Sequence, residues 1–136
     1  MHQKSILIVD DELLIRDLLY DFFTERDWLV SVADSAEKGI ELFKNRRFEM
    51  VMVDLKMPEV DGIDFIKKIR AISATVPIIM MTGFPSLESA VEALRLKIDD
   101  YIIKPFNINK LYKTVTAIAE KGQPETAPIN AEDIIL

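Results

Sequence analysis

The sequence predicts an α/β protein in which a doubly wound parallel sheet carries helices on both faces. Short apolar segments, such as residues 6–9 and 50–53, are typical of buried parallel strands. Segments with apolar residues at helical spacing separate them, and the pairing of a strand with a helix occurs five times in about 120 residues. This repetition predicts parallel strands joined by right-handed crossovers.

The first two strand–helix units occupy residues 6–43. A strand at residues 6–9 precedes a helix at residues 12–26, whose apolar stripe is Ile15, Leu18, Leu19 and Phe22. A second strand at residues 28–33 is rich in β-branched and aromatic residues, and the segment 34–37 offers N-cap residues for the second helix. The apolar positions of that helix are Ala36, Gly39, Ile40 and Phe43.

The remaining three units follow the same pattern. The third strand ends at Asp54, and a turn-rich loop with Pro58 leads to a helix marked by Phe65, Ile66 and Ile69. The fourth strand spans residues 77–82, and Ser86 is the expected N-cap of a helix whose sheet-facing stripe is Leu87, Ala90, Val91 and Leu94. The fifth strand spans residues 100–103, and the last helix is marked by Ile108, Leu111, Val115 and Ile118.

Composition and net charge exclude several classes of function. With 136 residues, of which 49% are hydrophobic, the chain has the size of one domain with its own core. The net charge is −6 and no lysine or arginine cluster is longer than a pair, which predicts no nucleic-acid binding through this domain. The absence of cysteine excludes disulfides, thiolate metal sites and a cysteine nucleophile. No apolar segment approaches the roughly 18 residues of a membrane span, which predicts a soluble, cytoplasmic protein without a membrane partner.

The pattern of strands and helices stops near Gly122. We therefore expect a domain at residues 1–121 and a linker or tail at residues 122–136. The tail ends in three apolar residues, Ile134, Ile135 and Leu136, which favours a linker toward an output domain that is absent from this chain over a simple frayed end.

Acidic and polar residues stand where the predicted strands end. Asp10 and Asp11 follow the first strand, and Asp54 follows the apolar residues of the third. Thr82 and Lys104 lie at the ends of the fourth and fifth strands. Because parallel strands end at the same edge of a sheet, these five residues should converge where open α/β sheets bind ligands.

This constellation predicts phosphoryl chemistry with a metal ion. Three neighbouring carboxylates repel one another unless a cation compensates, and Mg²⁺ prefers oxygen ligands. We expect Asp11 and Asp54 to ligate the metal, with Asp10 reaching it directly or through water. Asp54 is the expected nucleophile, which would become an acyl phosphate. The metal, the Lys104 ammonium and the Thr82 hydroxyl would each stabilise one phosphoryl oxygen.

Five motifs, in this order, give the chain a resemblance to the receiver domain of two-component response regulators. They are Val9-Asp-Asp-Glu12, Val53-Asp-Leu-Lys-Met-Pro58, Asp61-Gly62, Met81-Thr-Gly83 and Tyr101-Ile-Ile-Lys-Pro-Phe106. The resemblance covers about residues 4–121 and implies a flavodoxin-like fold with the strand order 2-1-3-4-5.

The resemblance also implies a mechanism. A sensor histidine kinase or a phosphotransfer protein would donate the phosphoryl group to Asp54 in a magnesium-dependent reaction that the domain itself catalyses, as it would the later dephosphorylation. The main-chain carbonyl of Lys56 would be a further metal ligand. Thr82 would move toward the phosphoryl group, Tyr101 would turn inward, and the surface formed by the fourth helix, fifth strand and fifth helix would change its partner preference.

Further expectations follow from the same resemblance. The expected downstream partner is an output domain or an effector protein. A homodimer that forms on phosphorylation is a further partner that the resemblance allows. Lys56 stands where relatives commonly have a small polar residue. Its long cationic side chain is expected to lie in solvent, and the alternative is that it sits over the site and modulates dephosphorylation. Gly83 leaves the approach to Asp54 less shielded, which predicts a shorter acyl-phosphate lifetime. The bond between Lys104 and Pro105 is expected to be cis, as is usual in the family.

Three other functions fit the sequence less well. A haloacid-dehalogenase-like phosphatase needs a second aspartate two residues after its nucleophile, where this chain has Lys56. A flavodoxin-like flavin carrier needs a phosphate loop rich in glycine and hydroxyl groups after the first strand, where Asp10, Asp11 and Glu12 would repel phosphate. The third alternative is a phosphorylation-independent, receiver-like module that only binds proteins, which the intact set of site residues disfavours.

Overall fold

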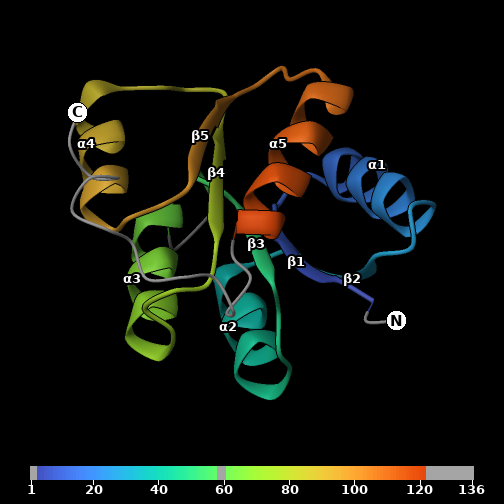
Figure 1. Ribbon diagram of the computed structural model, residues 1–136. Coiled ribbons are helices and arrows are strands. Elements are labelled where there is room, and N and C mark those ends of the chain that lie inside the picture. Colours follow the sequence, from blue (N-terminus) through green and yellow to red (C-terminus); the bar gives the residue numbers. More distant parts are fainter. Residues whose placement is uncertain (1–2, 58–60, 122–136) are drawn as a thin grey trace, which may run out of the picture.

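The computed structural model describes residues 3–57 and 61–121, which form a five-stranded parallel sheet between two layers of helices (Figure 1). The strands are β1 (Ser5–Val9), β2 (Leu29–Ala33), β3 (Met50–Asp54), β4 (Ile78–Thr82) and β5 (Asp100–Ile103). The helices are α1 (Leu13–Thr24), α2 (Ala36–Asn45), α3 (Gly62–Ile72), α4 (Leu87–Arg95) and α5 (Ile108–Lys121). The strand order β2-β1-β3-β4-β5 confirms the order that the resemblance implies.

Each face of the sheet has its own hydrophobic core. Helices α1 and α5 cover one face, and α2, α3 and α4 lie on the other (Figure 1). Successive side chains of a strand point to opposite faces, so Ile6 and Ile8 join the first core while Leu7 and Val9 join the second. Every residue of β3 and β4 is buried. At about 1.5–3 kcal/mol for each large apolar side chain, this burial holds the strand ends in fixed positions.

Three helices begin at the polar residues that capping rules select. The Ser35 hydroxyl accepts from the Lys38 N–H at 3.3 Å at the start of α2. The Asp61 carboxylate accepts from an N–H of α3 at 2.9 Å, and Ser86 accepts from the Ser89 N–H of α4 at 3.1 Å. The expected cap at Ser86 is therefore confirmed.

The expected orientation of α4 is wrong. Its predicted sheet-facing stripe includes Leu87 and Leu94, but these side chains are 82% and 74% exposed, and Val91 is also exposed. The helix buries Ala93 instead. It lies at the margin of the fold, next to α3 (Figure 1), so a narrow contact through a small residue suffices to hold it. Apolar residues at helical spacing define a stripe, but they do not decide which way the stripe faces.

Two further expectations have different outcomes. The bond between Lys104 and Pro105 is cis, as expected. The linker or tail at residues 122–136 lies outside the described residues. Among the helices of the described part, none combines the length and the apolar character that crossing a membrane requires.

Candidate functional site

The ends of four strands bring the predicted site residues to one edge of the sheet. Asp10 follows β1 directly, Asp54 and Thr82 are the last residues of β3 and β4, and Lys104 follows β5. The side chains of Asp10 and Thr82 are fully buried, and Asp54 is 4% exposed. Buried charges need partners, so the contacts within this group are what make the arrangement tenable.

Lys104 is the central cation of the site. Its Nζ lies 2.9 Å from Asp10 Oδ2, 3.1 Å from Glu12 Oε1 and 3.4 Å from Asp54 Oδ2. The Lys104 side chain is 12% exposed, so water screens its ion pairs with the buried Asp10 and Asp54 only weakly, whereas Glu12 is exposed to solvent. One ammonium therefore bridges carboxylates that come from two different strands.

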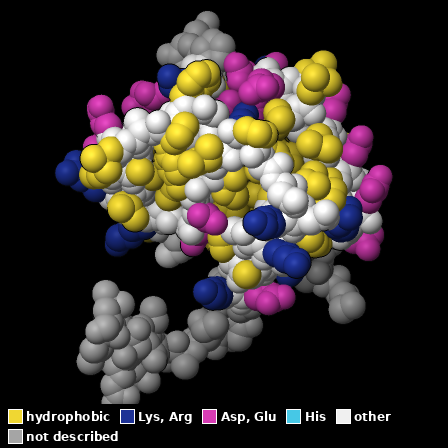
Figure 2. Space-filling view, turned by 90° about the horizontal axis from the view of Figure 1, so that it is seen from above, with side chains coloured by type: hydrophobic (Ala, Val, Ile, Leu, Met, Phe, Trp, Pro, Cys, Tyr) yellow, Lys and Arg dark blue, Asp and Glu magenta, His cyan; other side chains and the backbone are white. Residues whose placement is uncertain are grey.

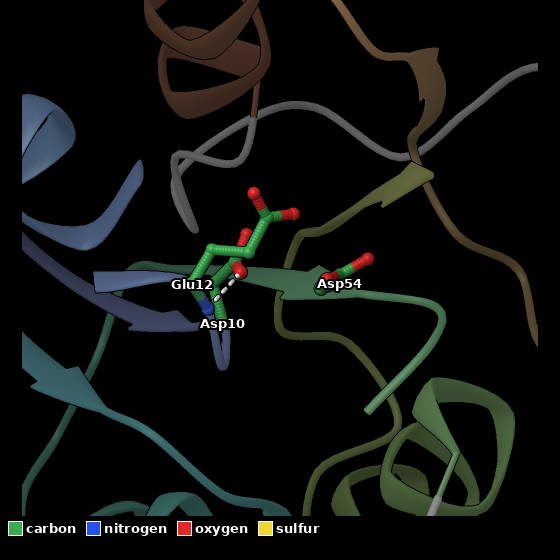
Figure 3. Close-up of side chains that lie close together, drawn as sticks. All are labelled: Asp10, Glu12 and Asp54. Carbon is green, nitrogen blue, oxygen red and sulfur yellow. Dashed lines mark hydrogen bonds between the residues drawn. The ribbon is translucent and has the colours of Figure 1, made fainter. Parts of the chain in front are cut away.

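The carboxylates themselves form a candidate metal site. One oxygen each from Asp10, Glu12 and Asp54 lies within 4.8 Å of the others, and Figure 3 shows the three side chains close together at the ends of β1 and β3. The Glu12 N–H donates to Asp10 Oδ1 at 2.9 Å, which fixes the first carboxylate. Opposite ligands of an octahedral Mg²⁺ are about 4.2 Å apart, so a small closure of this group would suit the ion. The donor set, all carboxylate oxygens, fits a hard divalent cation.

The structure places the predicted metal ligands in different relations to the acidic cluster. Asp11, a predicted ligand, is exposed and is not part of this cluster, whereas Glu12, which was not predicted, is part of it. The sequence signal for Glu12 is its place in the acidic run, but spacing alone does not decide which of three adjacent carboxylates turns inward. The Lys56 N–H donates to Asp54 Oδ1 at 3.3 Å, which places this main chain beside the site. The ligand roles of Asp11 and of the Lys56 carbonyl stay predictions.

The electrostatics of the site oppose the charge on Asp54. Burial, together with the negative charge of Asp10, raises the pKa of Asp54 from 3.8 to about 6, although Lys104 acts in the opposite direction. Burial alone would lower the pKa of Lys104, but its hydrogen bond to Asp10 and the surrounding carboxylates raise that pKa above its ordinary value. The resting site is therefore short of positive charge.

The two predicted switch residues have polar partners in the structure. Thr82 Oγ1 accepts from the Phe84 N–H at 2.9 Å. Tyr101 is half-buried on β5, and its hydroxyl lies 2.6 Å from the Ser89 hydroxyl of α4. Each residue is thus held by a hydrogen bond to the segment that runs from the end of β4 into the first turn of α4, called here the β4–α4 segment. The roles of Thr82 and Tyr101 as a switch stay predictions.

Exposed hydrophobic side chains surround this edge of the sheet. Figure 2 looks down on it and shows apolar side chains interspersed with acidic ones. The exposed apolar residues at or after the strand ends are Leu13, Leu14, Phe84, Leu87 and Ile103. Apolar surface of this kind around a polar site is typical of a protein–protein contact.

A parallel sheet whose carboxyl edge gathers buried carboxylates and a lysine defines an α/β protein with an acidic site suited to metal and phosphoryl chemistry. Residues 6–116 match the family described as response regulator receiver domain, and the chain belongs to this family.

Relatives agree with this assignment. The chain is 35% identical over 128 residues to the transcriptional regulatory protein ZraR of Escherichia coli O157:H7, a match that covers 94% of this chain and 28% of ZraR. It is 39% identical over 108 residues to the regulatory protein AtoC of Escherichia coli K12, covering 79% of this chain and 23% of AtoC. The chain thus spans about a quarter of the length of these relatives.

Solved structures agree as well. A CheY-like receiver domain protein from Methanospirillum hungatei superimposes with a TM-score of 0.89 at 30% identity, over 92% of this chain and all of that one. The response regulator TrrA of Thermotoga maritima, solved in complex with Mg²⁺-BeF, gives a TM-score of 0.77 at 28% identity, over 85% and 99% of the two chains. Receiver domains act in two-component signal transduction and bind Mg²⁺, and this chain carries the acidic cluster for it.

Proposed function

We propose that Asp54 accepts a phosphoryl group from a sensor histidine kinase or a phosphotransfer protein, with Mg²⁺, and that the modification switches the surface of α4, β5 and α5. The observation that carries this proposal is the buried Asp54 carboxylate at the end of β3, 3.4 Å from Lys104 and grouped with two further carboxylates. A structural aspartate in a core would not be grouped with like charges, because they oppose its ionisation.

The transfer step follows from these residues. An oxygen of Asp54 attacks phosphorus, and an O–P bond forms while the N–P bond of the donor phosphohistidine breaks. The electron pair of that bond returns to the imidazole nitrogen, which takes a proton from solvent. Lys104 and the Thr82 hydroxyl donate hydrogen bonds to the phosphoryl oxygens as negative charge develops on them.

The metal would be held by carboxylates of the β1 and β3 ends and by the Lys56 carbonyl. Asp10, Asp11 and Asp54 are the carboxylates assigned to it, with Glu12 close enough to contribute directly or through water. Mg²⁺ supplies positive charge that offsets the repulsion between the carboxylates and the incoming phosphoryl group.

Two hydrogen bonds of the resting site support the proposed switch. The Thr82 hydroxyl accepts from the Phe84 N–H in the resting protein; it would donate to a phosphoryl oxygen, and turning toward that oxygen would break the bond to Phe84. Tyr101 would leave the Ser89 hydroxyl and turn inward. Because both bonds involve the β4–α4 segment, their loss would shift the population of α4 positions.

Partners would contact the exposed apolar residues at the site edge and the solvent-facing stripe of α4. The side chains that begin α1 suit a histidine kinase or phosphotransfer protein, which must bring its phosphohistidine to Asp54. The relatives are named as transcriptional regulators and are longer than this chain, which supports residues 122–136 as a linker to an output domain. Downstream effector binding and phosphorylation-linked dimerisation would use the surface of α4, β5 and α5.

The test is phosphorylation by a small donor. Wild type and Asp54→Asn are incubated with acetyl phosphate and Mg²⁺, with and without chelator, and their intact masses are recorded. We expect wild type to gain one phosphoryl group that depends on Mg²⁺ and is lost in hydroxylamine, and the variant to gain none. Absence of the gain in wild type, under conditions that label another receiver domain, would overturn the proposal in favour of a phosphorylation-independent binding module.

A further inference from the structure

A cation–π contact bridges the two segments that border the site. Lys56 follows β3 and Phe84 follows β4, and Lys56 Nζ lies 4.7 Å from the centre of the Phe84 ring. The ring is 67% exposed, so hydrophobic burial does not explain its position. Among the described residues Lys56 forms no ion pair, and the aromatic face is the partner that these residues offer to its ammonium.

The same two residues are tied to the reacting part of the site by their main chains. The Lys56 N–H donates to Asp54 Oδ1 at 3.3 Å, and the Phe84 N–H donates to Thr82 Oγ1 at 2.9 Å. The cation–π contact therefore completes a chain of interactions that runs from the proposed phosphoryl acceptor to the proposed switch hydroxyl. A phosphoryl group on Asp54 would disturb this chain at both of its ends.

We propose that Lys56 is a second cation for the phosphoryl group, held on the Phe84 ring in the resting protein and transferred to a phosphoryl oxygen once Asp54 is phosphorylated. This proposal rests on the proposed function of Asp54. A phosphorylated side chain carries about 1.5 to 2 negative charges, and Lys104 is already shared among three carboxylates. A charge-assisted hydrogen bond to phosphate is stronger than an exposed cation–π contact, so the ammonium moves to the new anion.

Lys56 has the reach for this movement. Its main chain is hydrogen-bonded to Asp54, and its flexible four-carbon stem lets the ammonium leave the ring without a shift of the backbone. Phe84 then competes with the phosphoryl group for one cation. Removal of the ring and removal of the cation should consequently have opposite effects on phosphoryl binding, which a purely steric barrier over the site would not produce.

The test uses beryllium fluoride, a phosphoryl mimic, at saturating Mg²⁺ with the full chain, and its apparent dissociation constant is measured from amide NMR spectra. We expect Lys56→Met to weaken binding roughly threefold to tenfold and Lys56→Arg to restore it. Phe84→Leu should tighten binding about two- to fivefold, the range that loss of an exposed cation–π contact allows. In the Lys56→Met background, Phe84→Leu should have no further effect.

The matched control is Lys113→Met, which removes the same charge from an exposed position on α5. An effect of Lys113→Met as large as that of Lys56→Met would overturn the proposal, because it would reduce Lys56 to a contribution to net charge. Weaker or unchanged binding in Phe84→Leu would overturn it as well. Failure of the proposed function gives a different result, in which wild type and Asp54→Asn bind beryllium fluoride equally or not at all.

Discussion

Asp54 should destabilise the fold in the absence of metal, and Asp54→Asn should therefore be more stable than wild type at neutral pH. Burial and Asp10 raise the pKa of Asp54 from 3.8 to about 6. At about 1.36 kcal/mol per pKa unit, this rise corresponds to about 3 kcal/mol of unfavourable free energy when Asp54 is ionised. Asparagine has nearly the same shape and no charge, so it removes this penalty.

The destabilisation by Asp54 should increase as the pH rises. Because the pKa of Asp54 is higher in the folded than in the unfolded protein, the folded state binds the proton more tightly. The penalty is absent below about pH 4, grows as the pH rises to about 6, and is complete above that. The stability advantage of Asp54→Asn should accordingly be about 3 kcal/mol at pH 7.5 and only about 1 kcal/mol at pH 4.5.

Urea unfolding in the presence of a chelator measures this advantage as the difference in free energy of unfolding at the two pH values. Asp17→Asn is the control, since Asp17 is exposed on α1 and its replacement should change stability by less than about 0.5 kcal/mol. Added Mg²⁺ should stabilise wild type and not the Asp54→Asn variant. An advantage that is absent at pH 7.5, or that increases as the pH falls, would refute the account of the site as short of positive charge.

Three further predictions concern residues around Asp54. Gly62→Ala should destabilise the protein by about 1–3 kcal/mol, measured in urea, because the added Cβ would lie 2.5 Å from the Asp54 main-chain oxygen; stability equal to wild type would contradict the packing described. Gly83→Thr should slow hydrolysis of the acyl phosphate, because the nearest atom to a Cβ there is 3.9 Å away and leaves room for a shielding side chain. Intact mass recorded over time measures the hydrolysis rate, and an unchanged rate would count against this role. Ser89→Ala should increase the inward population of Tyr101 about two- to tenfold, because the tyrosine hydroxyl loses a hydrogen bond. The chemical shifts of the Tyr101 ring measure this change, and unchanged shifts would show that the bond does not hold the ring outward.

The sequence predicts the fold and most of the site because both depend on where apolar segments end. A parallel sheet places the carboxyl ends of its strands at one edge, so the residues at these ends meet whatever the loops between them do. Asp10, Asp54, Thr82 and Lys104 all occupy such positions, and the structure brings them together. Residues further along the loops are not constrained in this way.

The features that sequence reasoning missed depend on side-chain direction. Glu12 lies at the N-cap of α1 and pairs with Lys104, and the spacing of an acidic run does not show which of its side chains turns inward. The stripe of α4 has the spacing of a buried face, yet Leu87 is exposed because the helix lies at the margin of the fold. The contact between Lys56 and Phe84 joins two loops, and no periodic pattern encodes the distance between them.

In the proposed function, the charge balance of the site would link phosphorylation to movement. Among the described residues, Asp10, Glu12 and Asp54 form ion pairs with one ammonium, that of Lys104, so the ionised site carries an excess of negative charge before any phosphoryl group arrives. A divalent cation would compensate for this excess. A phosphoryl group on Asp54 would then add about one negative charge net, because the carboxylate loses its own charge when it forms the acyl phosphate. In the proposed function the hydrogen-bond donors for the phosphoryl group come from Lys104, from the Thr82 hydroxyl and from the loops that follow the strands. The Phe84 N–H is bonded to Thr82 Oγ1 in the resting protein, so we expect the β4–α4 segment to move when Thr82 turns toward a phosphoryl oxygen.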